Sequence, residues 1–539
     1  MFKFIQRKLK FLHVGRRKSG MLPAAPQRPA PQFSIPNNEI SANLQETFDL
    51  IHVVFGNSTD LVIRRFNMGR QPAEAMIAHL NGMSELNLVN ENILGSLMGE
   101  AGKVNLPEKI TIAYLKESTI HINGIKEITT MEEAVAAILD GDTAFFMAGS
   151  KSALVLQTQT WAHRGVQQPE TEPVVRGSRE GFTETLTINV SQIRRKIKDP
   201  DLQFESLHLG RRTRTEVCVV YIKDIANPGI VTEVWRRLQE TDIDAVLESG
   251  YIEEFIQDAP LSIFPTVGNT ETPDKFAAKI LEGRVGILVE GTPFALTVPF
   301  LFVESFQVAE DYYSRSFFTS LIRLLRFLAL HLTIVLPALY VAIVTFHPNI
   351  IPETLLLTIA RTREGIPFPA FVEALLMGIF YEIFREGSVR MPRIVGQAVS
   401  IVGALILGEA AVNAGIISPL MVIITGLTAV TGFLLPPQTD SITLLRVPLM
   451  VMASFFGLFG IIWSYLFVII HLASLRSFGS PYLAPLMPLT FKDLKDSFIR
   501  LPWPLLQTRP WAIHGLDAQR IGTKRQADPP KEKQTGDED

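Results

Sequence analysis

Cysteine and net charge are both scarce in this sequence, and each scarcity excludes a class of protein. Cys218 is the single cysteine among 539 residues, so neither an internal disulfide nor a paired-cysteine metal site can form. It lies in the apolar run 217–221, which predicts a buried strand thiol. The formal net charge of -3 at pH 7 provides no global field for nucleic acid, and we expect no nucleic-acid partner.

Motifs that mark enzymes are missing as well. The sequence contains no P-loop, no G-x-G-x-x-G after a strand, no G-x-S-x-G and no H-E-x-x-H. Its ten histidines are scattered, and His331 and His471 fall within apolar stretches, where packing is a better interpretation than metal ligation. We therefore expect a protein that is not an enzyme and that holds neither a metal nor a cofactor.

Long apolar stretches, in contrast, dominate the second half of the chain. A membrane span needs roughly 20 mostly apolar residues to cross about 30 Å of hydrocarbon. The last stretch is longer than that and must tilt or extend into the interface. The stretches cover residues 327–346, 368–384, 395–412, 416–435 and 447–475. They predict an all-α multi-pass transmembrane domain of about five spans.

An internal repeat organises the first half of the chain. Residues 136–141 (Ala-Ala-Ile-Leu-Asp-Gly) match residues 278–283 (Ala-Lys-Ile-Leu-Glu-Gly) at an offset of 142, and Gly149 matches Gly291 at the same offset. Each copy reads as a helix, a glycine turn, a strand, a second glycine-containing turn and a strand. Two copies are too few for a solenoid, so a duplication is predicted. The predicted fold class is an α/β tandem-duplicated soluble domain followed by the all-α multi-pass transmembrane domain.

The repeat also decides how residues 285–298 are interpreted. The apolar run over residues 285–303 is long enough to suggest a sixth span, but the counterpart in the first copy, residues 144–157, is too polar to cross a bilayer. We therefore predict a strand hairpin there. Upstream, the sequence predicts helices over residues 41–55 and 73–80 and a strand over 61–66, which is paired with the strand at 217–222 as its counterpart in the second copy.

Composition divides the chain into six regions and suggests an orientation. The Lys/Arg bias of the loops favours a cytoplasmic N-terminal domain. Five spans would then place the basic C-terminal segment outside, so its side of the membrane stays open. The regions are a basic, proline-rich tail and linker (1–38), two α/β subdomains (39–165 and 185–310), the transmembrane domain (327–475), a membrane-proximal C-terminal segment (476–515) and a disordered polar tail (516–539).

Three carboxylates within or at the ends of apolar stretches are candidates for an ion pathway. A carboxylate in the bilayer costs a few kcal/mol or more, so it usually faces a partner, water or the bundle interior. Glu373 and Glu382 are nine positions apart and lie on opposite helix faces; Glu382 has Arg385 at i+3 as a possible partner, and Glu373 can lie at an interface. Glu409 adjoins the uncharged loop 413–415 and is the preferred candidate.

Small residues define a candidate packing face. Gly396, Ser400, Ala404 and Gly408 are spaced four residues apart, which permits close approach of helix backbones where lipid removes the hydrophobic driving force. Chance enrichment of small residues is the alternative. Pro337 predicts a kink near the middle of the first apolar stretch.

Several segments resemble a known family, the A subunits of GerA-type spore germinant receptors. The resemblance covers about residues 40–510, and the segment 281–295 is its most specific part. One departure is Gly378, where the family often has an acidic residue. The segments that carry the resemblance are residues 256–265, 272–274, 281–295 (Leu-Glu-Gly-Arg-Val-Gly-Ile-Leu-Val-Glu-Gly-Thr-Pro-Phe-Ala), 310–313, 337–342 and 384–392 (Phe-Arg-Glu-Gly-Ser-Val-Arg-Met-Pro).

This resemblance implies a multi-pass protein of the spore inner membrane, surrounded by membrane lipid, with its N-terminal domain in the cytoplasm. It implies a transporter-like B subunit, which binds the nutrient, and a lipoprotein C subunit as partners. It also implies a homo-oligomer, a pentamer, that forms a ligand-gated cation channel and triggers germination. The alternatives are a SpoVAF-type paralogous channel subunit, a secondary transporter and a non-conducting scaffold for germination proteins. The sequence does not identify the nutrient.

Overall fold

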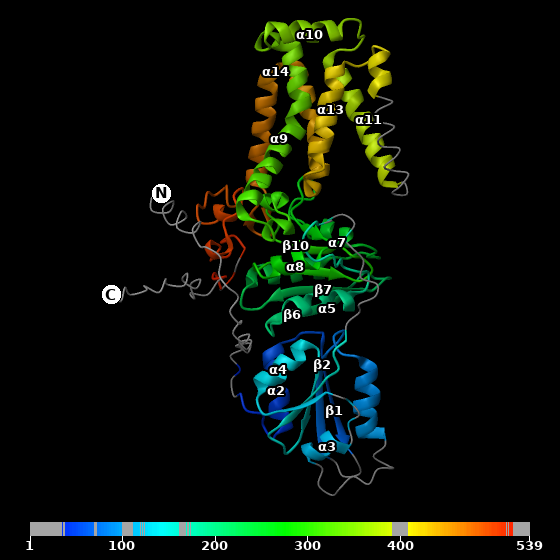
Figure 1. Ribbon diagram of the computed structural model, residues 1–539, viewed down its shortest axis with the longest axis vertical. Coiled ribbons are helices and arrows are strands. Elements are labelled where there is room, and N and C mark those ends of the chain that lie inside the picture. The colour runs from blue at the N-terminus through cyan, green and yellow to red at the C-terminus, as the bar shows by residue number, and fades with distance from the viewer. Residues whose placement is uncertain are drawn as a thin grey trace, which may run out of the picture.

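The computed structural model divides into an α/β region and a helical region stacked along one long axis (Figure 1). It describes residues 35, 38–68, 73–99, 111–118, 120, 122, 124–160, 169, 172, 174–390, 408–513, 515 and 517–520. The basic tail and nearly all of the polar C-terminal tail predicted from the sequence lie outside the described residues.

The first α/β unit is a five-stranded antiparallel sheet with helical segments on both faces. Its strand order is β1-β2-β4-β5-β3. The α2 and α4 side chains pack on one face, and those of η2 and α3 pack on the other. The elements are α2 (Leu44–Phe55), β1 (Leu61–Met68), β2 (Ala73–Leu80), η2 (Leu88–Gly99), α3 (Ile112–Ser118), β3 (Ile125–Ile128), α4 (Met131–Asp140), β4 (Thr143–Met147) and β5 (Ala153–Leu156).

The second unit repeats this plan element by element. Its sheet has the order β6-β7-β9-β10-β8, and α4, β4 and β5 begin 142 residues before α8, β9 and β10. The predicted hairpin at 285–298 is confirmed, because β9 and β10 pair antiparallel. The elements are α5 (Leu186–Lys196), β6 (Leu202–Leu209), β7 (Thr215–Ile222), α6 (Pro228–Glu240), α7 (Ser249–Ile256), β8 (Gly268–Thr270), α8 (Pro273–Ile280), β9 (Val285–Val289) and β10 (Ala295–Val298).

One predicted helix is wrong: residues 73–80 form the strand β2. Met76 and Ala78 face α2 and α4, whereas Ala75 and Ile77 face η2 and α3. Because both faces are buried, the strand shows none of the polar alternation that marks a half-exposed strand, and alanine, leucine and methionine favour a helix. The prediction that strand 61–66 and strand 217–222 are counterparts in the two copies is also wrong. Strand 217–222 is β7, which takes the place of β2 in its sheet, and the counterpart of β1 is β6. Cys218 is 1% exposed in β7, as predicted, and burial raises the pKa of its thiol.

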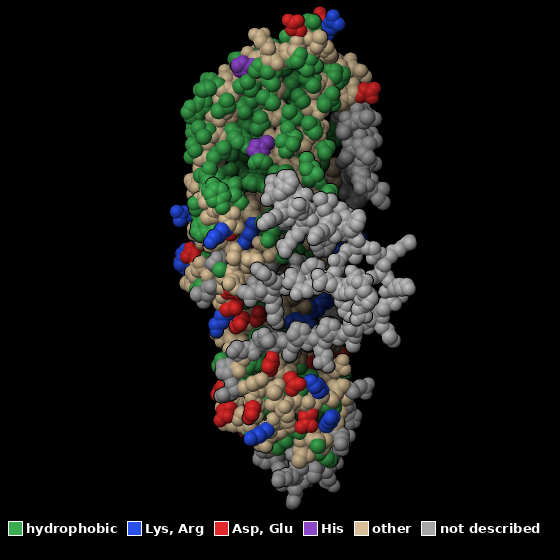
Figure 2. Space-filling view, turned by 60° about the vertical axis from the view of Figure 1, so that its left-hand side comes forward, with side chains coloured by type: hydrophobic (Ala, Val, Ile, Leu, Met, Phe, Trp, Pro, Cys, Tyr) green, Lys and Arg blue, Asp and Glu red, His purple; other side chains and the backbone are tan. Residues whose placement is uncertain are grey.

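The helical region contains two helical segments, among the residues described, that are long and apolar enough to cross a membrane: Ser316–Phe346 and Pro436–Ser474. Figure 2 shows hydrophobic side chains covering this region on the face in view, with charged side chains at its two ends. Pro337 lies inside the first of these helices, where the kink was predicted. The elements are α9 (Ser316–Phe346), η5 (Pro348–Ile350), α10 (Glu353–Arg363), α11 (Ala370–Arg390), α13 (Pro419–Gly432), η6 (Pro436–Gln438) and α14 (Thr439–Ser474).

The fifth predicted span, 447–475, is not one straight helix, because α14 folds back on itself. Ser441 donates a hydrogen bond to the Ile263 carbonyl, and His471 contacts the hydroxyl of the neighbouring Ser262 at 2.9 Å. A straight helix would separate positions 441 and 471 by about 45 Å. The reversal lies at Gly457, whose φ of 61° and ψ of -141° are not helical. The two arms, residues 439–456 and 458–474, are each about 25–27 Å long.

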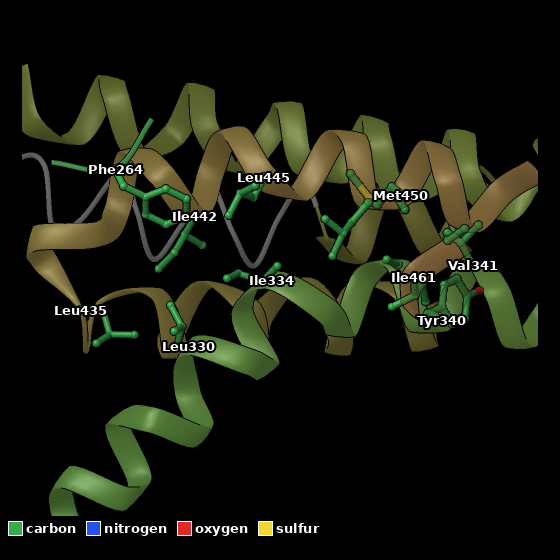
Figure 3. Packing of buried hydrophobic residues seen from close by; sticks show 14 of the residues in the cluster. Phe264, Leu330, Ile334, Tyr340, Val341, Leu435, Ile442, Leu445, Met450 and Ile461 are labelled. Carbon is green, nitrogen blue, oxygen red and sulfur yellow. The ribbon is translucent and has the colours of Figure 1, made fainter. Parts of the chain in front are cut away.

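The core of the helical region lies between α9, α13 and the two arms of α14. Figure 3 shows Leu330 and Ile334 of α9 facing Ile442 and Leu445 of the first arm. On the outside, α14 exposes many large apolar side chains, which a surrounding apolar medium would cover. They include Phe455, Phe456, Phe459, Ile462, Phe467 and Ile470.

The C-terminal segment returns to the α/β region. The Phe302 backbone N–H donates to the Tyr482 carbonyl at 2.9 Å, and Phe478 packs in the core of the second sheet. Ala484 and Ile513 pack against the 301–303 segment after β10. This segment therefore lies at the same end of the helical region as both sheets (Figure 1).

Candidate functional site

Glu373 lies at the centre of a polar cluster that joins α9, α10, α11 and the start of α13. Its side chain is fully buried and forms an ion pair with Arg363 at 2.8 Å. Its Oε2 also accepts a hydrogen bond from the Ser418 backbone N–H at 3.0 Å. Arg363 donates to the Tyr340 hydroxyl, which contacts the Ser418 hydroxyl, each at 2.9 Å. Glu373 lies in the first turn of α11, at the end of the bundle beside α10, so its predicted place near an interface stays a prediction. Its side chain is paired with Arg363, and one of these buried charges without the other would be costly.

Glu382 lies in a second cluster, toward the α/β region, between α11 and α14. It forms ion pairs with Arg385 at 2.8 Å and with Arg446 at 3.6 Å, and it accepts a hydrogen bond from the Thr443 hydroxyl at 3.3 Å. Arg446 also lies over the ring of Tyr381. Two guanidinium groups face one carboxylate here, so the cluster carries a net positive charge. The partner Arg385 was predicted from the sequence, whereas Arg446 was not.

Glu409 differs from the other two candidates in its environment. It lies in the helical residues 408–413, is exposed, and forms no ion pair with any residue that the structure describes. The Gly408 backbone beside it is buried, and a Cβ there would lie 3.4 Å from Val422 of α13. The other members of the predicted packing face, Gly396, Ser400 and Ala404, lie outside the described residues. Glu409 as an ion-pathway residue stays a prediction.

The two histidines within the apolar stretches have packing partners. His331 stacks against Phe327 and Tyr465, and its Nδ1 donates to the Phe327 carbonyl at 2.8 Å. His471 lies beside Phe264 and hydrogen-bonds Ser262. Both arrangements agree with the interpretation as packing residues.

A buried ionic network joins α9 to the α/β region and to the C-terminal segment. Arg323 is 0% exposed and donates to Asp311 and to Asp496, each at 2.8 Å. Arg326 pairs with Asp311 at 2.9 Å, and the Tyr312 hydroxyl donates to Asp496 at 2.9 Å. Asp311 follows β10, whereas Asp496 belongs to the C-terminal segment. A displacement of α9 along its axis would therefore break buried ion pairs to two segments at once.

A second network lies at the edge of the second sheet. Lys279 of α8 pairs with Glu304, and Arg284, which is 2% exposed, pairs with the same carboxylate at 2.9 Å. Burial lowers the pKa of the Lys279 amine well below its usual range. Glu304 lies in η3 (Phe302–Phe306), the turn between the second sheet and α9. The two networks together fix the base of α9 to the sheet beneath it.

Sequence reasoning missed the arginines because their partners are distant along the chain. Arg323 and Asp496 are 173 residues apart, and Arg446 and Glu382 are separated by 64 positions. Only the Glu382–Arg385 pair carried a local signal, an i,i+3 spacing. The sequence does place arginines beside apolar stretches, but the Lys/Arg bias that sets membrane orientation explains that placement equally well.

Two α/β units, the second of which is joined by buried ion pairs to a bundle of apolar helices, define the class: a protein with a large N-terminal α/β domain and a C-terminal helical region compatible with membrane association. The chain belongs to the family described as Bacillus/Clostridium GerA spore germination protein, whose model matches residues 49–512. This confirms the resemblance to A subunits of spore germination receptors.

Individual relatives align over most of both chains. Spore germination protein KA of Bacillus subtilis (strain 168) is 41% identical over 477 residues, 88% of this chain and 87% of the relative. Spore germination protein GerLA of Bacillus cereus is 39% identical, covering 89% of this chain and 97% of the relative. The crystal structure of the N-terminal domain of the A subunit of the Bacillus megaterium spore germinant receptor GerK3 is 33% identical, with a TM-score of 0.40, covering 50% of this chain and 98% of that chain.

Proposed function

We propose that this chain is the A subunit of a nutrient-responsive germinant receptor and that several copies, five by the resemblance, form a cation channel in the spore inner membrane. Membership of the GerA family supports the role in germination. The transporter-like B subunit and the lipoprotein C subunit are the proposed partners. The observation that carries the channel proposal is the apolar helical region, which exposes hydrophobic side chains on its outside and holds an exposed carboxylate, Glu409, with no ion-pair partner among the described residues.

The proposed topology has six membrane crossings. They are α9, α11, the predicted stretch 395–412, α13 and the two arms of α14. An even number places the C-terminal segment on the same side as the α/β region, which agrees with the contacts between Tyr482 and Phe302. It also removes the conflict between five spans and a basic C-terminal segment, because both regions would lie in the cytoplasm.

Within this proposal, Glu409 is the preferred residue of the ion pathway. Glu373 and Glu382 are each neutralised by an arginine at 2.8 Å, so neither offers a free negative charge to a passing cation. Glu409 is exposed and has no such partner among the described residues. A carboxylate at a pore mouth concentrates cations and disfavours anions through its local field.

The proposal is tested by cation current through the assembled protein in bilayers and by cation release from spores. Glu409→Gln keeps the shape of the side chain and removes its charge, so it should lower current and cation selectivity while assembly persists. Glu254→Gln is the control, because Glu254 is an exposed carboxylate of α7 in the α/β region. No current from assembled wild-type protein would favour a non-conducting scaffold. Equal current and selectivity in the two variants would remove Glu409 from the pathway.

A further inference from the structure

An apolar cavity of about 230 Å³ lies where the helical region meets the α/β region. It is lined by α9, both arms of α14, the loops before β8 and after β10, and the C-terminal segment. Figure 3 shows Phe264, Ile442 and Leu445 facing Leu330 and Ile334 across this part of the core. The lining residues that define its chemistry are Leu330, His331, Ile334, Gln438, Tyr465 and Leu472.

One polar group in this lining lacks a partner. Gln438 is 1% exposed, and its Nε2 donates to the Ser305 hydroxyl at 2.8 Å. Its Oε1 is buried and forms no hydrogen bond with any residue that the structure describes. An unpartnered buried amide oxygen is costly, so a ligand that supplies a hydrogen bond here gains more than it would in water.

Two further groups define what polar chemistry the cavity accepts. Because the Nδ1 of His331 donates to the Phe327 carbonyl, its Nε2 is left as an acceptor. The Tyr465 hydroxyl forms no hydrogen bond among the described residues and can donate or accept. The lining contains no Asp, Glu, Lys or Arg side chain, so a carboxylate or ammonium group would be buried without a counter-charge.

The size and position of the cavity limit the rest of the ligand. An apolar cavity of about 150 Å³ holds benzene, and on the same scale 230 Å³ holds roughly nine non-hydrogen atoms. The first residue of α9 that lines the cavity is Phe327. It directly follows Arg326, the last charged residue of that helix before its long apolar run. The cavity therefore lies at the level where a lipid headgroup region would give way to acyl chains.

We propose that this cavity binds a neutral amphiphile, an alkyl chain of about eight carbons that carries a hydroxyl group. The chain fills the space between α9 and the two arms of α14, and the hydroxyl bonds the Gln438 amide. A hydroxyl supplies the donor that the Gln438 Oε1 lacks, whereas the Gln438 Nε2 already donates to the Ser305 and Tyr482 hydroxyls. The same chemistry occurs in a free alkanol and in a neutral lipid such as a monoacylglycerol.

The test is photolabelling of the full chain in phospholipid nanodiscs with a diazirine-bearing octanol, followed by mapping of the labelled residues. Label should reach Leu330 and Leu472 in a saturable way, whereas exposed Phe459 reports unsaturable labelling from bulk lipid. 1-Octanol should compete for the saturable label, and octanoate, its charged counterpart, should not. Competition by monooctanoylglycerol as well would assign the site to a neutral lipid; competition by 1-octanol alone would assign it to a free alcohol.

Two variants extend the test. Gln438→Met removes the amide at similar size, so the concentration of 1-octanol for half-competition should rise about three- to tenfold, the effect of one neutral hydrogen bond. Ile334→Phe fills the cavity and should abolish the saturable label. Label at Leu330 that is unsaturable and uncompeted in the wild-type protein overturns the proposal, and this measurement does not depend on either variant folding or on channel activity.

Discussion

The reversal of α14 at Gly457 makes the sharpest prediction about the helical region. Its backbone has φ 61° and ψ -141°, a combination that residues with a side chain avoid. A Cβ at this position would also lie 2.8 Å from the His347 Nε2 and 3.1 Å from Cβ of Phe346. The backbone strain alone costs about 1–3 kcal/mol. Displacement of His347 adds to this, so we expect Gly457→Ala to lower the free energy of unfolding by more than the strain.

The matched control is Gly378→Ala in α11. A Cβ there meets nothing within 4 Å, and its backbone is helical. Replacing a helical glycine by alanine stabilises a helix by about 0.5–1 kcal/mol, so the two substitutions have opposite expected signs.

The assay is the unfolding temperature of both variants and the wild-type protein, purified in one detergent. We expect Gly378→Ala to unfold at or above the wild-type temperature and Gly457→Ala clearly below it. If Gly457→Ala were as stable as Gly378→Ala, the left-handed reversal would not exist, and residues 439–474 would form one continuous helix. In that case the six-crossing topology would fail with it.

Three further predictions address sidedness, pH dependence and packing. The sidedness test uses single cysteines in a background without the native Cys218 and an impermeant maleimide on sealed vesicles. The reagent should label Lys492→Cys and Glu254→Cys from one side of the membrane and Glu353→Cys from the other. Labelling of positions 492 and 353 from the same side would contradict six crossings. Burial raises the pKa of Glu253 to about 7, above its ordinary value of 4.5, so the buried ionised carboxylate destabilises the folded state above pH 7. This destabilisation disappears below pH 4.5, where the carboxyl is protonated in both the folded and the unfolded chain. Glu253→Gln should therefore raise the free energy of unfolding of the chain by about 1–3 kcal/mol at pH 8 and leave it unchanged at pH 4, as measured by denaturant titration. Gly408→Leu should lower the unfolding temperature of the chain, because a Cβ at this position already lies 3.4 Å from Val422 of α13 and a leucine side chain would force the two helices apart; an unchanged unfolding temperature would exclude Gly408 from helix packing.

The α/β half of the fold was predictable where the sequence repeats itself. The offset of 142 residues aligned helix, turn and hairpin in both copies, and it separated the hairpin β9–β10 from a membrane span. The prediction failed at β2, which is buried on both faces and has no period-two pattern. Tertiary burial overrode helix propensity there, and no local signal in the sequence reveals it.

The reversal of α14 was not predictable from hydropathy. Residues 447–475 are apolar throughout, and a glycine in such a stretch is also compatible with close helix packing. What distinguishes Gly457 is its left-handed backbone and its contact with the end of α9, both properties of the folded chain. The excess length of this stretch was the one clue, and two short arms explain that excess better than a tilt does.

The two copies of the α/β unit diverge where the second copy supports the helices. Lys279 and Arg284 occupy the positions of Ala137 and Asp142 in the first copy, and both pair with Glu304 in the turn that leads to α9. In the first copy, burial raises the pKa of Asp142 to about 6, and no helix bundle follows to provide a cation. A fold-level duplication thus predicts the shared sheet, whereas the charges that connect one copy to the helices depend on partners outside the repeat. We expect movement of the second sheet to be coupled to α9 through these ion pairs, because separating a buried ion pair costs more free energy than separating a solvated one.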